Sequence, residues 1–436
     1  MIEKYYAGAI EQVAAGLGTV EKNYLLVRYS GQFSVENLND TKQLEKNEDI
    51  FVQVHEFETG EITCAYEPYL TMICDGFRRY MTGTFEEFME TCDVYYLHRP
   101  VLLGYFNQDN TGREEIILLD EVAYEQERML AALERMLCAI ADRHPVLFVL
   151  NRFQLASKST MQLTARFLKC ENCNIGLVLG VSDIQAMPEF LVPDWEMLYE
   201  TLDDGSKIYH IGNSGRKKEE TIDDEKYVDY GSEKVYRKLQ NMVEFLDFDQ
   251  AAYYLETIER KIKFDNLLVD DAARFRMWLL FVKVSILRQD IPKALEICED
   301  LEKIHLAGKE EECAYEQDYL IATAYMYQGK LKEALEMAGE TYRIAGKMSD
   351  DYRMFLSELL EAKIQMSGWY NIFFCAQDVK IKESLIQNLI RYNYRNHLAH
   401  VYIYAYDNKP EIVKKANQSE ELLIYFSRGI RIAKEI

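Results

Sequence analysis

The chain has 436 residues, a length that predicts two or three domains. Its 73 acidic and 50 basic residues leave a net charge of −23. A chain this acidic repels phosphate backbones and anionic lipid surfaces, so we expect no nucleic-acid binding and no membrane attachment. With only 7 prolines and 21 glycines, the sequence is neither collagen-like nor of low complexity.

The cysteines and the N-terminal segment bear on the cellular compartment. The nine cysteines are odd in number and irregularly spaced, so they match no disulfide framework. Residues 1–20 contain Glu3 and Glu11 and lack the basic stretch and apolar run of a signal peptide. The longest apolar runs, such as 146–150, are far shorter than the ~20 residues of a membrane helix. We therefore expect a reduced, cytoplasmic protein.

The first half of the chain alternates between short apolar runs and amphipathic segments. The apolar runs predict buried strands at residues 24–29, 49–55, 146–150, 175–181 and 207–211. Apolar residues three or four apart predict helices at residues 1–16, 65–80, 84–106, 114–143, 157–169 and 195–202, and residues 35–46 are compatible with another. Because strands alternate with helices, we predict an α/β domain whose parallel sheet is covered on both faces.

The composition changes between residues 203 and 232. A basic run that begins at Arg216 is followed by an acidic run that ends at Glu225. Such charge runs are typical of a solvated linker. We therefore place a domain boundary near residue 225, with the α/β domain at 1–225 and a second domain at 226–436.

The second half has no convincing strand pattern and carries a weak internal repeat. In each copy a helix ends, the chain turns, and a small or apolar residue opens the next helix. The copies are residues 246–251, 289–294, 329–334 and 368–373, whose last residues are 43, 40 and 39 apart, with a fifth turn expected at 407–410. Stacked helical hairpins bury their apolar faces on their neighbours, so we predict an all-α repeat domain.

The third copy is the sharpest. It resembles the tetratricopeptide repeat in its ladder of small, aromatic, glycine and apolar residues, carried by Ala322, Tyr325, Gly329, Leu331 and Ala334. The resemblance implies a tetratricopeptide-like solenoid.

The first half resembles the ATPase module of STAND-type signalling proteins, a branch of the AAA+ and P-loop superfamily. The likeness is carried by residues 145–163, 174–182 and 65–70, which are similar to two core strands of that family and to the segment after its second strand. It implies a P-loop-like fold for the α/β domain.

The phosphate-binding motif of that family is missing. A phosphate loop has the form G-x-x-x-x-G-K-[ST], because backbone N–H groups and a lysine surround the phosphates. If Gly31 is taken as the first glycine, Glu36, Asn37 and Leu38 occupy the G-K-[ST] positions. A carboxylate there repels phosphate, and a leucine cannot hold Mg²⁺.

The other nucleotide motifs are also changed. The acidic pair that ends a core strand in the family is Asn151-Arg152 here, and Asp183 follows the next strand where an arginine is more usual. Neither metal ligation nor water activation is well served. We therefore expect a pseudo-ATPase with no cofactor and no bound metal. The positions of its degenerate, silent nucleotide site are Gly31, Glu36, Asn37, Asn151 and Arg152.

A further resemblance covers four short strings. Residues 29–33, 55–57, 66–69 and 93–100 are similar to the N-terminal part of certain bacterial diguanylate cyclases, which join a degenerate ATPase-like domain to tetratricopeptide-like repeats and an output domain. The chain has no G-G-[DE]-E-F string, so it cannot carry that cyclase site. The resemblance implies a sensory or regulatory half without its output.

Two pairs of residues have side chains that can bind metals. Cys170 and Cys173 form a lone CxxC, which suits zinc or redox chemistry less well than two structural thiols, because no second pair stands at ligand spacing. His397 and His400 share a helix face without a third ligand, so we expect them at a contact between repeats.

Aromatic residues crowd the C-terminal region. Their tyrosines are consistent with two roles, the packed core of the solenoid or a peptide-binding face. They are Tyr392, Tyr394, Tyr402, Tyr404 and Tyr406. We expect a protein or peptide partner on the repeats, and a homo-oligomer is compatible with the sequence.

No catalytic constellation emerges from the sequence, which has no G-x-S-x-G string. The leading hypothesis is a non-enzymatic signalling or scaffold protein with an inactive ATPase-like domain. The alternatives are a nucleotide-gated switch with an atypical ATP site and the sensory half of a diguanylate cyclase.

Overall fold

The computed structural model describes residues 2–19, 23–30, 33–35, 49–58, 61–109, 121–170, 174–182, 187–203, 208–211, 229–265, 267–304, 306–367, 382–398 and 401. The chain forms two compact units. The first comprises Met1–Gly112 and Asp120–Val269, and the second comprises Arg113–Leu119 and Asp270–Ile436. The predicted boundary near residue 225 lies outside the described residues.

The first unit contains a parallel sheet, as the alternation of strands and helices predicts. Its five strands are ordered β2-β3-β4-β1-β5, and every neighbouring pair is parallel. They are β1 Tyr24–Tyr29, β2 Phe51–Glu56, β3 Val146–Asn151, β4 Ile175–Ser182 and β5 Ile208–Ile211. Each strand coincides with a predicted apolar run, with ends that differ by at most a residue or two.

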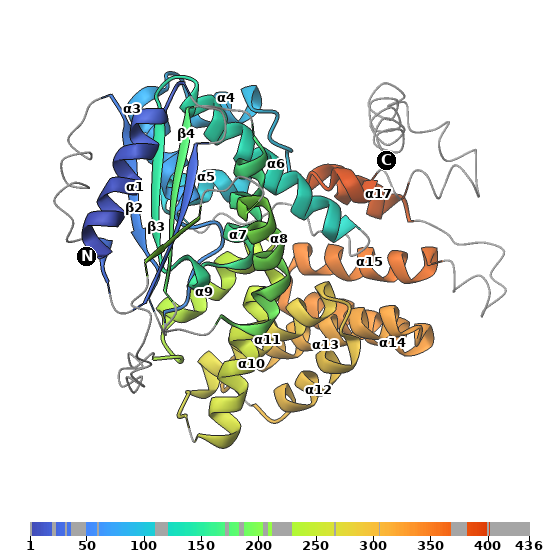
Figure 1. Ribbon diagram of the computed structural model, residues 1–436. Coiled ribbons are helices and arrows are strands. Elements are labelled where there is room, and N and C mark those ends of the chain that lie inside the picture. The colour runs from blue at the N-terminus through green and yellow to red at the C-terminus, as the bar shows by residue number, and fades with distance from the viewer. Residues whose placement is uncertain are drawn as a thin grey trace. The chain divides into compact units, whose positions relative to one another are not determined.

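The helices of the first unit lie on both sides of this sheet, with α1 on one side and α6, α7 and α8 on the other (Figure 1). Their bounds are α1 Ile2–Gly16, α3 Tyr69–Tyr80, α4 Phe85–Thr91, α5 Arg99–Asn107, α6 Val122–Ala141, α7 Lys158–Lys169, α8 Val192–Asp203, α9 Glu233–Glu244 and α10 Phe248–Phe264.

Side-chain alternation along β3 explains why both faces need a cover. Leu147 and Val149 point to the same face and pack in one buried cluster with Ile10 of α1. Phe148 points to the opposite face, where its ring meets the ring of Tyr69 on α3 at a centroid distance of 4.7 Å. All six residues of β3 are buried, as expected for a central parallel strand.

The predicted helix at 84–106 is two helices, α4 and α5. Thr84 and Glu87 form a capping box that starts α4. Pro100 stands in the first turn of α5, where its missing N–H leaves no helical bond unmade, so it begins a helix rather than interrupting one.

The second unit is helical throughout its described residues, which agrees with the all-α prediction. Its helices are α11 Asp271–Leu287, α12 Ile291–Leu301, α13 Glu310–Gln328, α14 Leu331–Met348, α15 Asp351–Met366 and α17 Glu383–Arg391. Helix α13 packs against α11, α12, α14 and α15. The arrangement is that of helical hairpins in contact with their neighbours, as in helical repeats.

Three of the predicted repeat turns have the same backbone geometry. Leu246, Gln289 and Gly329 stand between the two helices of their hairpins with φ of 66°, 62° and 82°. The next residue in each case donates its N–H to the carbonyl five residues earlier, at 2.8, 2.8 and 2.9 Å. This is the left-handed helix end that satisfies the last carbonyls of a helix. The hairpins α9–α10, α11–α12 and α13–α14 therefore share one turn geometry, which also ends α14 at Ser349, between two hairpins.

The small residue expected after each turn is also in place. Ala251, Ala294 and Ala334 are fully buried in the second helix of their hairpins. A methyl side chain at these points lets the paired helices approach closely. The predicted turns at 368–373 and 407–410 lie outside the described residues. The first hairpin, α9–α10, belongs by its contacts to the first unit.

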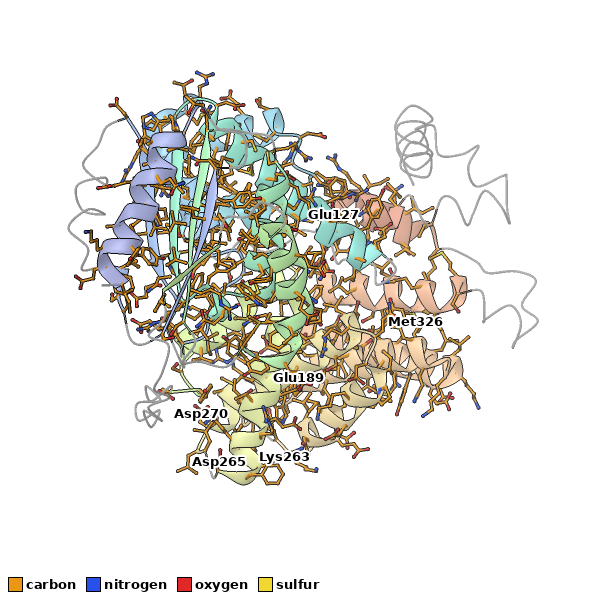
Figure 2. All side chains as sticks on the ribbon, viewed as in Figure 1. Glu127, Glu189, Lys263, Asp265, Asp270 and Met326 are labelled. Atoms are coloured by element: carbon orange, nitrogen blue, oxygen red, sulfur yellow. The ribbon has the colours of Figure 1, made fainter. Side chains whose placement is uncertain are left out.

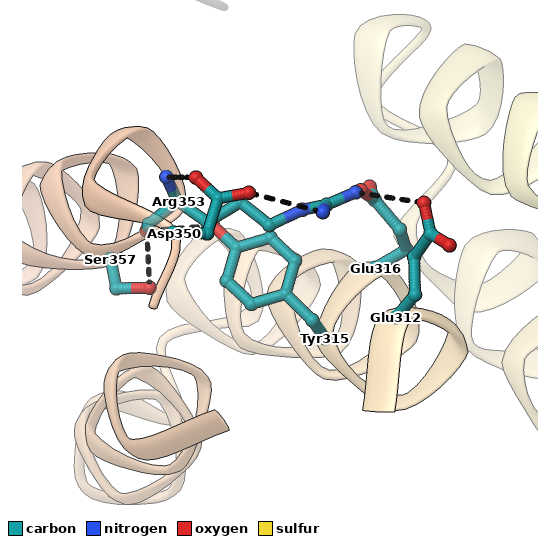
Figure 3. Close-up of polar contacts among 6 residues, drawn as sticks. All are labelled: Glu312, Tyr315, Glu316, Asp350, Arg353 and Ser357. Atoms are coloured by element: carbon teal, nitrogen blue, oxygen red, sulfur yellow. Dashed lines mark hydrogen bonds and ion pairs between the residues drawn. The ribbon is translucent and has the colours of Figure 1, made fainter. Parts of the chain in front are cut away.

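One arginine joins α15 to α13, two helices of the second unit (Figure 3). Arg353 of α15 pairs with Glu316 of α13 at 2.7 Å, with Glu312 at 3.4 Å, and with the N-cap carboxylate Asp350 at 3.2 Å. Its guanidinium lies over the ring of Tyr315, whose hydroxyl donates to the Arg353 carbonyl at 2.9 Å. These contacts fix the register of α15 on α13.

The shared turn geometry predicts opposite effects for two glycine substitutions. Gly329→Ala should lower the free energy of unfolding by about 1 kcal/mol, because an L side chain is strained at positive φ. Gly339→Ala, inside helix α14, should raise it by about 0.5–1 kcal/mol, because glycine weakens a helix interior. A Cβ at either position meets open space, so the pair isolates the backbone effect. Urea unfolding of both variants measures it, and shifts in the same direction would contradict it.

Candidate functional site

In parallel α/β sheets, ligands bind beyond the carboxyl ends of the strands. Two of the five predicted site residues are described at that edge. Asn151 is the last residue of β3, and Arg152 follows it. Gly31, Glu36 and Asn37 lie outside the described residues.

The side chain of Asn151 is completely buried and bonded at both ends. Its Oδ1 accepts a hydrogen bond of 2.7 Å from the hydroxyl of Tyr29, the last residue of β1. Its Nδ2 donates to the carbonyl oxygen of Phe33 at 3.0 Å. Asn151 therefore ties the end of β3 to the end of β1 and to the segment that follows β1. Both polar atoms of this buried side chain are thus engaged within the protein.

Gly180 of β4, which lies between β1 and β3, makes room for this bridge. A Cβ at Gly180 would come closer to Asn151 Oδ1 and to the hydroxyl of Tyr6 than real Cβ atoms ever do. Tyr6 is fully buried, and its hydroxyl has no hydrogen-bond partner among the described residues. Burial, and then the neighbouring Tyr29 and Glu56, raise the pKa of Tyr6. The cluster therefore holds neutral hydroxyls above the middle of the sheet.

A carboxylate of the protein itself occupies the donor groups of the segment after β1. Glu56, the last residue of β2, accepts hydrogen bonds on Oε2 from the hydroxyl of Ser34 at 2.5 Å and from the N–H of Val35 at 3.2 Å. Its Oε1 lies 3.3 Å from Nη2 of Arg152. The Glu56 side chain is only 8% exposed. The hydroxyl, amide and guanidinium that could have received an anion thus already hold one.

The N-terminus of α7 is filled in the same manner. This helix starts beyond the carboxyl end of β3, and helix N-termini attract anions through their free N–H groups. The N–H of Ser159 donates to Asp247 Oδ2 at 3.1 Å, and the N–H of Lys158 donates to Gln250 Oε1 at 3.3 Å. The Lys158 ammonium also pairs with the carboxylate of Asp249.

These capping groups come from the start of α10, so the hairpin α9–α10 is bonded to the α/β fold. Further bonds join them. Gln126 Nε2 of α6 donates to the Leu246 carbonyl at 2.8 Å, Lys238 Nζ to the Ile62 carbonyl at 2.7 Å, and Tyr254 hydroxyl to the Glu61 carbonyl at 3.3 Å. Burial raises the pKa of Asp247 to about 6.

Sequence reasoning located Asn151 and Arg152 but missed Glu56, Tyr6 and Asp247. The signal for Glu56 was a carboxylate at the end of an apolar strand, at the edge where sites form. Asp247 lies in the repeat segment 246–251, and an aspartate is common in a turn, so its sequence position gave no sign of a further role. Only the tertiary fold brings either residue to its partner.

The remaining candidates are partly described. Cys170 and His397 are placed, whereas Cys173 and His400 lie outside the described residues. Tyr394 is buried against Phe355 at a centroid distance of 5.1 Å and belongs to the helical core. Across the described part of the chain, no three His, Cys, Asp or Glu side chains gather in a way that could hold a metal ion.

Comparisons with protein-family models, with curated proteins and with solved structures find no match for this chain. Among the described helices, none has both the length and the apolar composition needed to cross a membrane.

The Asn151 bridge predicts that Tyr29→Phe destabilises the first unit by about 1–3 kcal/mol, because Asn151 Oδ1 is left buried and without a donor. The same change at Tyr5, whose side chain is 56% exposed, should stay within about 0.5 kcal/mol. Chemical unfolding of both variants makes the comparison. Equal effects would show that the hydroxyl of Tyr29 has no structural role.

The burial of Asp247 predicts a pH dependence of stability. Its folded pKa of about 6 exceeds the ordinary value of 3.8, so the folded state binds the proton more tightly than the unfolded chain. The resulting stabilisation is complete below about pH 4 and is lost as the pH rises through 6. Relative to Asp247→Asn, the wild type should therefore lose on the order of 2 kcal/mol between pH 4 and pH 7.

Unfolding at a series of pH values for wild type and Asp247→Asn measures this difference. Asp265→Asn is the matched control, because that side chain is exposed at the C-terminal end of the same helix, α10, and its variant should show no such pH-dependent difference. A flat difference between wild type and Asp247→Asn would contradict the assignment.

Proposed function

We propose that this chain is a non-enzymatic signalling or scaffold protein. In this proposal the α/β domain is a degenerate P-loop-like ATPase domain with a structural or regulatory role, and the helical repeats, of tetratricopeptide type, bind a protein or peptide partner. No cofactor is required for either role.

The observation that supports the first part is the occupied carboxyl edge of the sheet. Glu56 neutralises Arg152 and takes the donors of Ser34 and Val35. Asp247 and Asp249 take the N-terminus and the lysine of α7. A phosphate group would have to displace carboxylates that are held by several charge-assisted bonds, and it would be repelled by them as it approached.

The support for the second part is the recurring hairpin. Helix pairs with one turn geometry and neighbour-to-neighbour packing build extended surfaces that suit protein recognition. The net charge of −23 favours a partner with a basic patch.

Calorimetric titration of the full chain with ATP and Mg²⁺ tests the proposal. We expect no binding heat at millimolar ATP, which places any dissociation constant weaker than about 1 mM. The expectation extends to GTP, because both nucleotides carry the same phosphates. A catalytically unrelated ATP-binding protein, titrated with the same solutions, serves as the positive control. Micromolar affinity would instead favour the nucleotide-gated switch.

A further inference from the structure

Two cysteine sulfurs lie in contact on neighbouring helices of the first unit. Cys138 is in the last turn of α6, and Cys170 is the residue that ends α7. Their sulfur atoms are 3.8 Å apart and share a hydrogen bond. Both residues are partly exposed, whereas Cys74, Cys92 and Cys298 are buried. A small oxidant in solution can therefore reach this pair.

An ion pair holds the two sulfurs in register. Arg166 stands four residues before Cys170, and Glu134 stands four residues before Cys138, so each is one helical turn back on the same face. Arg166 Nε donates to Glu134 Oε2 at 2.7 Å. Arg166 also pairs with Glu127, which is marked on α6 in Figure 2. These ion pairs hold α6 and α7 in place, so that the two cysteines face each other.

Burial, and then the neighbouring Cys170 sulfur, raise the pKa of Cys138. Either sulfur can donate the hydrogen bond that joins the two side chains. Their contact, not a difference between them, prepares the pair to form a bond.

We propose that Cys138 and Cys170 are a redox modification site, at which a peroxide converts the two thiols into a disulfide between α6 and α7. The sulfur–sulfur bond of a disulfide is about 2.05 Å long, so the sulfurs must approach by roughly 2 Å, which side-chain rotation at two helix ends can supply.

The reaction balances with hydrogen peroxide as the oxidant. One of the two sulfurs, after losing its proton, attacks one peroxide oxygen, the O–O bond breaks, and the released hydroxide takes up that proton, so a sulfenic acid and water result. The other sulfur then attacks the sulfenic sulfur, the S–S bond forms, and the sulfenic oxygen leaves as a second water with the proton of the second thiol. The two thiols lose two electrons and two protons, and the peroxide takes up both.

The bond would close a loop around the centre of the site. Cys138 and Cys170 are separated by 32 positions, and this segment contains β3, Asn151 and Arg152. A cross-link of this kind stabilises a fold mainly by restricting its unfolded chain. Oxidation should therefore raise the midpoint temperature of the first unit by several degrees, and a thiol reductant should reverse the rise.

The test treats the full chain with hydrogen peroxide, alkylates the remaining thiols, and maps the peptides by mass spectrometry. We expect a cross-linked peptide that joins Cys138 to Cys170 and is two hydrogens lighter than its reduced parts. Cys138→Ser and Cys170→Ser should each abolish both the cross-link and the thermal shift. Cys313→Ser, which removes another partly exposed thiol, should leave both unchanged.

Three results would overturn the proposal. One is a cross-link between Cys170 and Cys173 in place of the expected one. Another is sulfinic acid at either cysteine without a cross-link, and the third is unmodified thiols after peroxide. If a serine variant does not fold, Cys138→Ala and Cys170→Ala replace it, because alanine introduces no polar group into the helix contact.

Discussion

The side-chain amide of Asn151 is the connection on which the carboxyl edge of the sheet depends. One buried residue receives the hydroxyl of β1 and donates to the segment beyond it, and it does so across β4 only because Gly180 has no side chain. A buried amide without hydrogen-bond partners lowers the free energy of unfolding. Tyr29 and Phe33 must therefore stay within hydrogen-bond distance of Asn151. Where Asn151 lies, the described edge is therefore packed as protein core, at the end of the sheet where parallel sheets of other proteins hold ligands.

Charge inside the first unit follows the same logic. Arg152 and Lys158 are cations at an edge where an anion would be expected, and each has an internal carboxylate beside it. Burying a charge is tolerable only when it is paired. Glu56 and Asp249 supply that pairing for Arg152 and Lys158. The acidity of the sequence is thus not confined to its surface.

The sequence was enough to predict the strands and most helices, because β3 and β4 are continuous apolar runs and α6 is regularly amphipathic. It was not enough to predict the contents of the site. Asn151 could be placed by its position after a strand, but the partners of Glu56 and Asp247 lie far away along the chain. The repeat illustrates the same limit. Gly329 indicates its turn in the sequence, because glycine favours positive φ. Leu246 and Gln289 adopt the same positive φ although neither residue type favours it, so their conformation depends on the tertiary fold.

The bonding of α9–α10 to the α/β fold has a consequence for synthesis on the ribosome. Asp247, which caps the N-terminus of α7, is made 88 residues after Ser159, its partner. At roughly 5–20 residues per second, the last strand, which ends at Ile211, is made about 2–7 seconds before that carboxylate exists. During this interval α7 has its own Ser157 cap, and Asp194 lies 4.0 Å from the Lys158 ammonium. The helix still lacks the bonds that Asp247 and Asp249 supply. The last step in folding of the first unit must wait for the hairpin to leave the ribosomal tunnel. A pause in synthesis just before residue 247 would prolong the incomplete state, and a truncation there would release an incomplete domain.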